Sequence, residues 1–522
     1  MEQPCGMKSD KSRSLNVLII LDGWGEAGPS DGNAVALADT PFLDRLETKY
    51  PVARLLCSGE AVGLPGNTMG NSEVGHMNIG AGRKVYQDLV RINRAIVDKT
   101  FFKNQAILDL LNRVKDKNSS VHLFGLLSDG GVHSHIDHLF ALMDMAHNSK
   151  IKNLYIHPIM DGRDTSPTSG IEYIKKVENH IKKIKFGQIA TVCGRFYAMD
   201  RDTRWDRVEQ AFKLYTSGSE HCFDDPVKAV QASYDAGITD EFIKPTAICS
   251  APCSKNIVVE DNDGIIFFNF RADRAKEITR AFTQNNFSEF KRKKPALSGF
   301  VSMTRYDADF NFRAAFEPVT LENVMGQVIS SQGLNQLRLA ETEKFAHVTY
   351  FFNGGSEKIL KGEERILIPS PRDVATYDLK PEMSALKIAS TALDNIEAGK
   401  FDFIVINFAN MDMVGHTGIL KAAVKACETV DKALETVVEK IWEKGGNAFI
   451  TADHGNSEEM LTKDGKPHTT HTLNPVKFIA AGSRFTGLKL KNGILGDIAP
   501  TILHSMDIDI PVEMTGKSLL IL

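Results

Sequence analysis

Two pairs of acidic and imidazole side chains have the spacing of metal ligands. Asp412 and His416 lie four residues apart in DMVGH, and Asp453 directly precedes His454 in TADHGN. A carboxylate and an imidazole four residues apart face the same way in a helical turn, which can place both on one ion. Oxygen and nitrogen donors without a thiolate suit Zn or Mn, and the polar surround favours Mn.

Three aspartates follow apolar, strand-like runs. Asp22 ends LIILD, Asp412 lies in INFANMD, and Asp453 ends FITAD. In open α/β sheets ligands bind beyond the carboxyl ends of strands, so these aspartates could converge. A single aspartate there is more often a helix cap or turn former. Caps do not readily explain three of them together with the histidines of HTTHTLNP, which offers His468 and His471.

Ser72 lies within NTMGNSEVGHMNIGAGR, beside Glu73 and four residues before His76. No strand precedes it directly, so the segment is not a nucleophile elbow. A helix that begins at Ser72 would direct free N–H groups at phosphate oxygens, and a divalent ion could activate the hydroxyl. Taken alone, Ser72 is better explained as a helix N-cap, with Glu73 and His76 on the helix surface. The metal motifs favour the nucleophile instead.

Arginines follow several strand-like runs in the middle of the chain, in MDGRDTSP, GRFYAMDRDTRWDR and FNFRADRAKE. A guanidinium matches carboxylate and phosphate oxygens two at a time, so the repeated placement predicts a small, doubly anionic ligand. Arginines beside aspartates also form surface ion pairs of little energetic value. The candidates are Arg163, Asp164, Arg195, Arg201, Arg271 and Arg274, with His133 and Lys344 from two further motifs. Asp164 could orient a ligand hydroxyl or pass a proton.

Short apolar runs alternate with amphipathic helical segments, which predicts an α/β fold with mostly parallel sheets. The expected strands are 15–21, 121–127, 153–160, 187–192, 264–270, 296–303, 401–408, 447–452 and 475–481, and the clearest helices are 171–184, 205–215 and 420–445. If the three aspartates meet, 15–86 and 317–522 form one domain and 87–316 form an inserted second α/β domain. We expect 1–14 to be a disordered extension.

Composition excludes several classes of protein. The chain has 522 residues, 42% hydrophobic and 25% charged, which is typical of a globular enzyme of two or more domains. A net charge of −4 gives no basic field for nucleic acid. There is no apolar run of membrane-spanning length, so we expect a cytoplasmic protein without a membrane partner. The seven cysteines are scattered, with Cys249 and Cys253 the one close pair, and we expect reduced thiols.

Taken together, these motifs resemble one family. LDGWG, GNSEVGHMNIGAGR, SDGGVHSH, DGRDT, GRFYAMDRD, FNFRADR, EKFAHVTYFFNGG, DMVGHTG, TADHGN and HTTHTLNPV are similar, in order, to the cofactor-independent phosphoglycerate mutases of the alkaline phosphatase superfamily. The likeness runs from about residue 15 onward. It implies an alkaline-phosphatase-like three-layer sandwich domain, discontinuous in sequence, with an inserted α/β transferase domain joined to it by hinges.

The resemblance also implies roles for individual residues. The enzyme would interconvert 3-phosphoglycerate and 2-phosphoglycerate in glycolysis and gluconeogenesis without 2,3-bisphosphoglycerate, as a monomer. Two divalent ions are implied, with Mn favoured and Zn, Co or Mg as alternatives. One ion would lie on Asp412, His416 and His471, and the other on Asp22, Ser72, Asp453 and His454. Ser72 would be phosphorylated, with Lys344 and Asp164 also catalytic. Substrate contacts would fall on His133, Arg163, Asp164, Arg195, Arg201, Arg271, Arg274 and Lys344.

Alternatives differ in the fate of the phosphoryl group. A metal-dependent phosphomonoesterase would share the metal motifs but has no need to hold its leaving group with arginines. A pentose phosphate mutase would differ in its substrate, and an inactive metal-binding or anion-binding protein would not need Ser72 and every ligand. The chain departs from the family pattern at Met411, Ser457 and Lys477, where proline, alanine and proline are expected.

Overall fold

The strand-like runs of the sequence form two separate sheets in a computed structural model that describes residues 14–249 and 256–521. The chain divides into two units between Tyr86 and Gln87 and again between Val319 and Thr320. The sequence places these joints at 86–87 and 316–317, and the domain assignment stays a prediction. Residues 1–13 of the expected disordered extension lie outside the described residues. Ser14 is exposed, and its hydroxyl donates to the Gly445 carbonyl at 3.0 Å.

The first unit is built on an eight-stranded sheet of order β13-β12-β14-β1-β15-β16-β2-β18. The strands from β13 to β15 run parallel to one another, whereas β16 is antiparallel to both of its neighbours. In this order the strands are β13 (Glu363–Ile368), β12 (Gln336–Glu341), β14 (Phe403–Phe408), β1 (Asn16–Leu21), β15 (Asn447–Thr451), β16 (Val476–Ala481), β2 (Val52–Leu56) and β18 (Gly493–Ile494).

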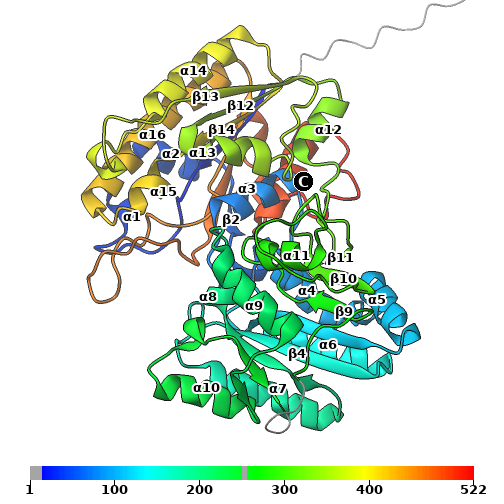
Figure 1. Cartoon of the computed structure of the whole chain (residues 1–522). Helices are drawn as coiled ribbons and strands as arrows, with labels where there is room; N and C mark the ends of the chain where they lie inside the picture. The colour runs from blue at the N-terminus through cyan, green and yellow to red at the C-terminus, as the bar shows by residue number, and fades with distance from the viewer. Residues whose placement is uncertain (1–13, 250–255, 522) are drawn as a thin grey trace, which may run out of the picture. The chain divides into compact units, whose positions relative to one another are not determined.

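Helices cover both faces of this sheet. One group packs α16 (Leu420–Glu443) against α14 (Ala385–Ala398) and α2 (Pro41–Lys49). The other places α3 (Ser72–Ala81) against α12 (Met325–Ser331) and α17 (Ile498–Ser505). In Figure 1, α14 and α16 lie on one side of β12 and β14, and α3 and α12 lie on the other. The unit is therefore a three-layer α/β sandwich.

The second unit carries its own sheet, of order β11-β10-β9-β3-β4-β6-β8-β7, with β5 (Gln188–Ile189) also paired to β4. The strands from β11 to β6 are parallel, and β8 is antiparallel to β6. They are β11 (Ala314–Phe316), β10 (Gly299–Thr304), β9 (Gly264–Phe267), β3 (Ser120–Leu127), β4 (Asn153–Met160), β6 (Thr191–Gly194), β8 (Thr246–Ile248) and β7 (Cys222–Phe223).

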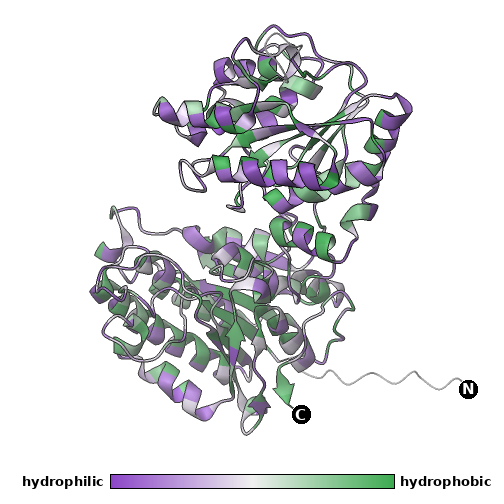
Figure 2. Cartoon of the chain, turned by 90° about the horizontal axis from the view of Figure 1, so that it is seen from below, coloured by the Kyte–Doolittle hydropathy of each residue, from purple (hydrophilic) through white to green (hydrophobic). Residues whose placement is uncertain are grey.

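Each face of the second sheet has its own hydrophobic core. Along β9 and the residue after it, Ile265 and Phe267 join one core, while Ile266 and Phe268 join the other. Because side chains alternate across a strand, a run of consecutive apolar residues shows that both faces are covered. Figure 2 shows the same pattern, with mainly hydrophobic strands and helices that mix hydrophobic and hydrophilic residues. The predicted α/β class with mostly parallel sheets is confirmed.

Two expectations from composition can be compared with this fold. The expectation of reduced thiols is wrong for one pair, because Cys222 and Cys249 form a disulfide. The strands β7 and β8 are neighbours, and they bring the two Cα atoms to 6.2 Å, a separation that sequence spacing did not reveal. Cys253 lies outside the described residues. Within residues 14–249 and 256–521, no helix is both long and apolar enough to cross a membrane.

Candidate active site

Strand order brings the three strand-end aspartates together. In the first sheet β1 lies between β14 and β15, in parallel register, with Leu21 opposite Phe408 and Ile20 opposite Thr451. Asp22 follows β1, Asp453 lies two residues past β15, and Asp412 lies in the short helix α15 (Asn410–Gly415) that follows β14. The Asp412 amide donates to the Asp22 carbonyl at 3.0 Å. Parallel neighbours thus join residues that are hundreds of positions apart in sequence.

Ser72 is the first residue of α3 and is almost fully buried. Its hydroxyl oxygen lies 2.6 Å from Lys344 Nζ, 2.9 Å from His454 Nε2 and 3.2 Å from Asp22 Oδ1. The helix is capped by Asn71, whose side chain accepts from the Val74 amide at 2.9 Å. The N-cap alternative for Ser72 is therefore wrong, and its hydroxyl is directed at charged groups instead.

The imidazoles lie beside the same carboxylates. The Nε2 atoms of His471 and His416 are each 3.1 Å from Asp412 Oδ1 and 3.1 Å from one another. His454 Nε2 lies 3.4 Å from Asp22 Oδ1. His468 does not join them, because its Nδ1 atom donates to the Glu459 carbonyl at 2.8 Å. Of the two histidines in HTTHTLNP, only His471 belongs to the site.

Lys344 supplies a positive charge between the aspartates. It lies in α13 (Thr342–Ala346), which follows β12, and its Nζ atom is 2.6 Å from Asp412 Oδ2 and 2.9 Å from Asp22 Oδ1. Burial alone would lower the pKa of Lys344, but the carboxylates of Asp22, Asp412 and Asp453 raise it above its ordinary value. The lysine is therefore charged at neutral pH.

The donor atoms of this site fit divalent cations. Asp412, His454 and His471 offer one set within 4.8 Å of one another, and Asp22, Asp453 and His454 offer another. Asp453 Oδ2 is buried and accepts no hydrogen bond, although His76 Nδ1 lies 3.1 Å from it. The three buried aspartates face the Lys344 ammonium and His454, whose pKa burial would lower but Asp453, Asp22 and Asp412 raise to about 10. Negative charge still remains in excess, which is costly unless a cation balances it. Nitrogen and oxygen donors without a thiolate suit Mn²⁺ and Zn²⁺.

Two further buried side chains were not predicted. His76 is fully buried rather than on the helix surface, and its Nδ1 atom donates to the Ser72 carbonyl at 2.9 Å. Asn407, from β14, lies 3.0 Å from His76 Nε2 and donates to Asp22 Oδ2 at 2.8 Å. These contacts hold Asp22 and the first turn of α3 in place. The signal was weak, because Asn407 is one polar residue within an apolar strand.

Apart from Lys344, the predicted anion-binding residues gather in the second unit, at the carboxyl ends of its strands. Arg195 is buried, and its Nη1 atom lies 2.6 Å from both Asp161 Oδ1 and Asp164 Oδ2. Asp161 Oδ1 also accepts from the amides of Arg163 and Asp164, at 3.2 and 3.0 Å. Asp161 directly follows β4 and was missed by sequence reasoning, although it belongs to the same MDGRDT motif.

Asp273 contacts three further members of this group. It pairs with Arg201 at 3.1 Å and with Arg271 at 3.2 Å, and it lies 3.6 Å from His133 Nδ1. Burial and the nearby Arg195 lower the pKa of His133 to about 4, so its imidazole is neutral at pH 7. The solvent-exposed pairs of Asp273 with Arg201 and Arg271 could be ordinary surface ion pairs of little energetic value. Arg195 is buried, so that explanation does not apply to it.

A cavity of about 370 Å³ opens onto these arginines. Two of its basic residues, Arg204 and Arg207, were not predicted, although GRFYAMDRDTRWDR contains both. The Arg207 guanidinium lies 3.8 Å over the Phe196 ring, which limits its freedom to contact a ligand. The basic lining residues outnumber the acidic ones, as an anionic ligand requires. They are Arg163, Arg195, Arg201, Arg204, Arg207 and Arg274, against Asp200, Asp202 and Glu241.

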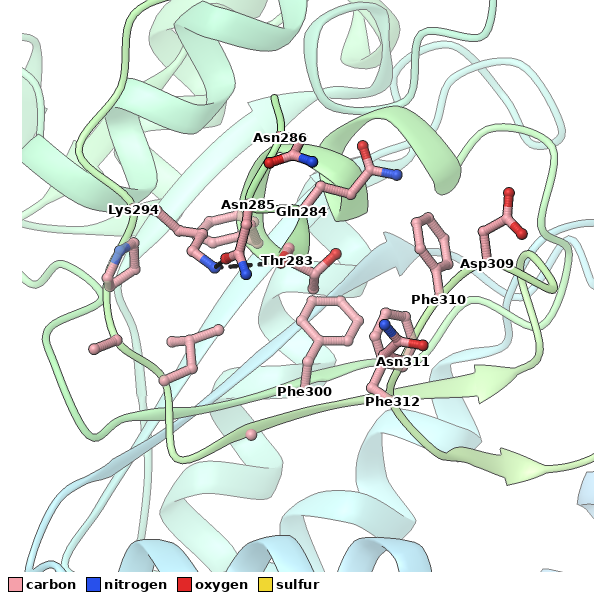
Figure 3. A pocket seen from close by; sticks show the side chains of 15 residues that line it. Thr283, Gln284, Asn285, Asn286, Lys294, Phe300, Asp309, Phe310, Asn311 and Phe312 are labelled. Carbon is pink, nitrogen blue, oxygen red and sulfur yellow. Dashed lines mark hydrogen bonds between the residues drawn. The ribbon is translucent and has the colours of Figure 1, made fainter. Parts of the chain in front are cut away.

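A second cavity in this unit, of about 660 Å³, has a different character. Figure 3 shows phenylalanine rings and carboxamides around it, with Lys294 and Asp309 its charged residues. The Lys294 ammonium already donates to Asn285 Oδ1 at 2.6 Å. Because one positive and one negative charge cancel, this cavity does not suit a doubly anionic substrate despite its greater volume. None of the predicted site residues lines it.

The fold and the two sites define a discontinuous α/β protein that carries a buried serine, a metal-type donor set and an arginine cluster. A crystal structure of Leishmania mexicana phosphoglycerate mutase at low cobalt concentration is similar to this chain, with a TM-score of 0.60 and 31% identity over 99% of each chain. Residues 92–308 match the family model described as the BPG-independent PGAM N-terminus.

Curated relatives are closer in sequence. A 2,3-bisphosphoglycerate-independent phosphoglycerate mutase of Syntrophotalea carbinolica is 52% identical over 505 residues, which are 96% of this chain and 98% of the relative. One from Methanosarcina barkeri is 53% identical over 524 residues, 98% of this chain and 99% of the relative. The chain belongs to the family of 2,3-bisphosphoglycerate-independent phosphoglycerate mutases, and its enzyme class is that of an isomerase acting on phosphoglycerate.

Two of the departures from the family pattern contact each other. The Ser457 hydroxyl donates to the Met411 carbonyl at 2.6 Å, a bond that alanine at 457 could not make. The third, Lys477, pairs with Glu47 at 2.7 Å. None of the three removes a donor atom from the site.

Proposed function

We propose that the chain interconverts 3-phosphoglycerate and 2-phosphoglycerate through a phosphoserine at Ser72, with two divalent ions. The observation that carries this proposal is the environment of the Ser72 hydroxyl, which contacts Lys344, His454 and Asp22 while almost fully buried. A hydroxyl that only capped a helix would need none of these charged neighbours.

The two ions are assigned to the donor sets given by the resemblance. Asp412, His416 and His471 hold one, and Asp22, Ser72, Asp453 and His454 hold the other. Bound there, divalent ions supply Lewis-acid stabilisation of the serine oxygen and of the phosphoryl oxygens. The preferred ion is Mn, ahead of Zn, Co and Mg, because the donors are carboxylates and imidazoles in a polar surround.

The residues of the chain carry the remaining steps. Ser72 attacks phosphorus in line with the leaving glycerate oxygen, and the Lys344 ammonium offsets negative charge on the transferring group. The arginines and His133 of the second unit retain the glycerate through its carboxylate and hydroxyl groups. Asp164 passes a proton between the glycerate hydroxyls, and the other hydroxyl then takes the phosphoryl group back. We also propose that the enzyme acts as a monomer in the cytoplasm, without nucleic-acid or membrane partners.

The arginine cluster favours a mutase over a phosphomonoesterase, because a hydrolase releases its alcohol. The test incubates the enzyme with 3-phosphoglycerate, without bisphosphoglycerate, and separates 2-phosphoglycerate from glycerate and inorganic phosphate. We expect 2-phosphoglycerate as the product, and no turnover of ribose phosphates. Stoichiometric release of phosphate would establish the hydrolase instead, and an absolute need for added bisphosphoglycerate would contradict the phosphoserine route.

A further inference from the structure

Glu458 is a buried carboxylate next to the candidate metal site that no step above uses. It lies five residues after Asp453, in the loop that follows β15, and its exposed fraction is 1%. A fully buried carboxylate is costly unless it is paired or hydrogen-bonded, so its partners indicate what it stabilises.

The Glu458 carboxylate accepts four hydrogen bonds, two at each oxygen. Oε2 accepts from the backbone amides of Gly25 at 3.1 Å and Asn456 at 2.8 Å. Oε1 accepts from the Thr472 hydroxyl and from Asn474 Nδ2 at 3.0 Å. Hydrogen bonds to an ionised carboxylate are about twice as strong as neutral ones. No basic side chain takes part in these bonds, so the carboxylate is held by neutral donors alone.

These four donors come from three loops that carry proposed metal ligands. Gly25 lies three residues after Asp22, Asn456 lies two residues after His454, and Thr472 directly follows His471. One carboxylate therefore links loops that contribute to both donor sets.

The packing leaves no room for the carboxylate to move toward either glycine. A Cβ atom added at Gly25 would lie 2.2 Å from the Glu458 carboxyl carbon, and one added at Gly455 would lie 2.3 Å from Oε1. Both distances are far below van der Waals contact. The carboxylate therefore packs directly against the backbone at Gly25 and Gly455, where no side chain could fit.

The two residues before Glu458 extend these contacts to the helix α15, which carries Asp412. Asn456 Nδ2 donates to Asp412 Oδ1 at 3.3 Å, and the Ser457 hydroxyl donates to the carbonyl of Met411. The Ser457 amide also donates to the Gly23 carbonyl at 3.1 Å. Residues 456–458 therefore form one short segment that contacts the parts of the chain carrying Asp22, Asp412 and His471.

We propose that Glu458 is a positioning residue that fixes the ligand-bearing loops, so that both donor sets are preorganised for their ions. This inference rests on the proposed two-ion function. Partners one shell beyond the ligands typically change metal affinity 10–100-fold when they are mutated. Glutamine is close in shape to glutamate but presents an NH₂ group to two of the four donors, so Glu458→Gln should loosen the loops without removing a ligand.

The test measures binding of Mn²⁺ alone to the full chain, by titration with detection of free Mn²⁺ by electron paramagnetic resonance. We expect two sites in the parent protein, and Mn²⁺ affinity about 10–100-fold weaker in Glu458→Gln. Glu459→Gln is the matched control, because it makes the same charge change at an exposed neighbour and should leave affinity unchanged. Glu458→Asp keeps the charge but has a shorter side chain, so its Mn²⁺ affinity should lie between those of the parent protein and Glu458→Gln.

Thermal unfolding with and without Mn²⁺ separates positioning from ordinary stabilisation. A merely structural residue would lower the Tm of the metal-free protein and leave the Mn²⁺-induced rise intact, whereas we expect Glu458→Gln to reduce that rise. If this variant does not fold, Thr472→Val removes one of the four bonds and should weaken binding by a smaller factor. Equal affinity in parent and variant would overturn the role of Glu458, and absence of Mn²⁺ binding in the parent would instead overturn the proposed metal function.

Discussion

The ammonium of Lys344 and the hydroxyl of Ser72 lie 2.6 Å apart in a site almost closed to solvent. In such surroundings charge interactions are much stronger than in water, since the effective dielectric constant is low. We propose that Lys344 has two roles, which are to balance the buried aspartates and, in the proposed reaction, to stabilise negative charge on the transferring phosphoryl group. The two roles can be separated experimentally, because only the second requires substrate.

Lys344→Met tests both roles. We expect kcat to fall by a factor of about 10²–10³, the usual cost of removing one preorganised donor to developing charge. In chelator the variant should also be less stable by roughly 3–5 kcal/mol, because aspartates remain buried without their counter-charge. Enzyme assays and urea unfolding measure the two effects. Lys380→Met, which removes an exposed pair with Asp373, should change neither, and equal losses in both variants would contradict this assignment.

The buried His138 should make the free energy of unfolding depend on pH. Burial, and then the nearby His135, lower the pKa of His138 to about 3, while its Nε2 atom bonds to Asn93 Oδ1 at 2.8 Å. Because the folded-state pKa lies below the unfolded value, folding releases a proton, and the stability from neutral His138 is full above about pH 6.5 and is lost as pH falls toward 3. Between pH 7 and pH 5 the expected loss is about 2 kcal/mol.

Replacing His138 by glutamine removes the titration while keeping a partner for Asn93. The dependence of the urea midpoint on pH between 7 and 5 should be shallower in His138→Gln than in the parent protein. The partly exposed His468 serves as the control, because His468→Gln should leave the dependence unchanged. Identical pH dependence in parent and His138→Gln would show that His138 contributes nothing to acid sensitivity.

At the scale of elements, the close approach of α3 to the loop after β15 fixes the position of Ser72. A Cβ atom added at Gly75 would lie 2.7 Å from the Asp453 carbonyl oxygen, so the helix reaches this loop only because residue 75 has no side chain. Alanine there would favour the helix by about 0.8–1.0 kcal/mol on intrinsic propensity alone. Steric contact opposes that gain.

Gly75→Ala should therefore lower kcat by a factor of about 10² or more, because displacement by 1 Å is enough to misalign reacting groups. The helix itself should persist, as circular dichroism would show. Gly28→Ala is a suitable control, since a Cβ atom added at Gly28 meets nothing within 4 Å. Full activity in Gly75→Ala would mean that α3 can move away from Asp453 without consequence for Ser72.

The elements differ in how well sequence predicts them. The apolar runs of β1, β3, β4, β14 and β15 were predicted, because a strand buried on both faces needs apolar residues throughout. Strand β12 was missed. It carries Gln336, Arg338 and Glu341, all fully buried, and the Arg338 guanidinium lies 4.7 Å over the Phe352 ring. Nothing in the local sequence indicates that such a polar segment is a central strand, since its partners come from elsewhere in the chain.

The residues of the candidate site also differ in how well the sequence predicts them. Ligand types and the proximity of the three aspartates followed from motifs at strand ends. The linking residues did not, because Asn407, Asp161, Asp273 and Glu458 act through contacts with residues distant in sequence. One polar residue in a strand or loop has many ordinary explanations, and only the tertiary contacts distinguish among them.

At the scale of the whole molecule, the two units have separate hydrophobic cores and separate charged sites. The proposed metal ligands all belong to the first unit, and the arginine cluster belongs to the second. Units with their own cores can unfold in separate transitions, so each ligand should act mainly on one of them.

Removal of metal tests this separation. We expect chelation to abolish activity, with Mn²⁺ restoring it better than Mg²⁺, and to lower the stability of the first unit selectively. Hydrogen exchange should become faster in the loops after β1, β14 and β15, and remain unchanged in β3, β4 and β9. Equally faster hydrogen exchange in both sheets would contradict the assignment of the ions to the first unit. Normal activity after complete chelation would rule out the two-ion site.

The most direct test of the account is to find the phosphoryl group on the enzyme. The purified protein is mixed with 3-phosphoglycerate, quenched in acid within a single turnover, digested, and analysed by mass spectrometry, with Ser72→Ala treated in parallel. We predict phosphate on the peptide that contains Ser72, its absence from the variant, and no mutase activity in that variant. Phosphate on another residue, or a Ser72→Ala protein with full mutase activity, would contradict the central claim.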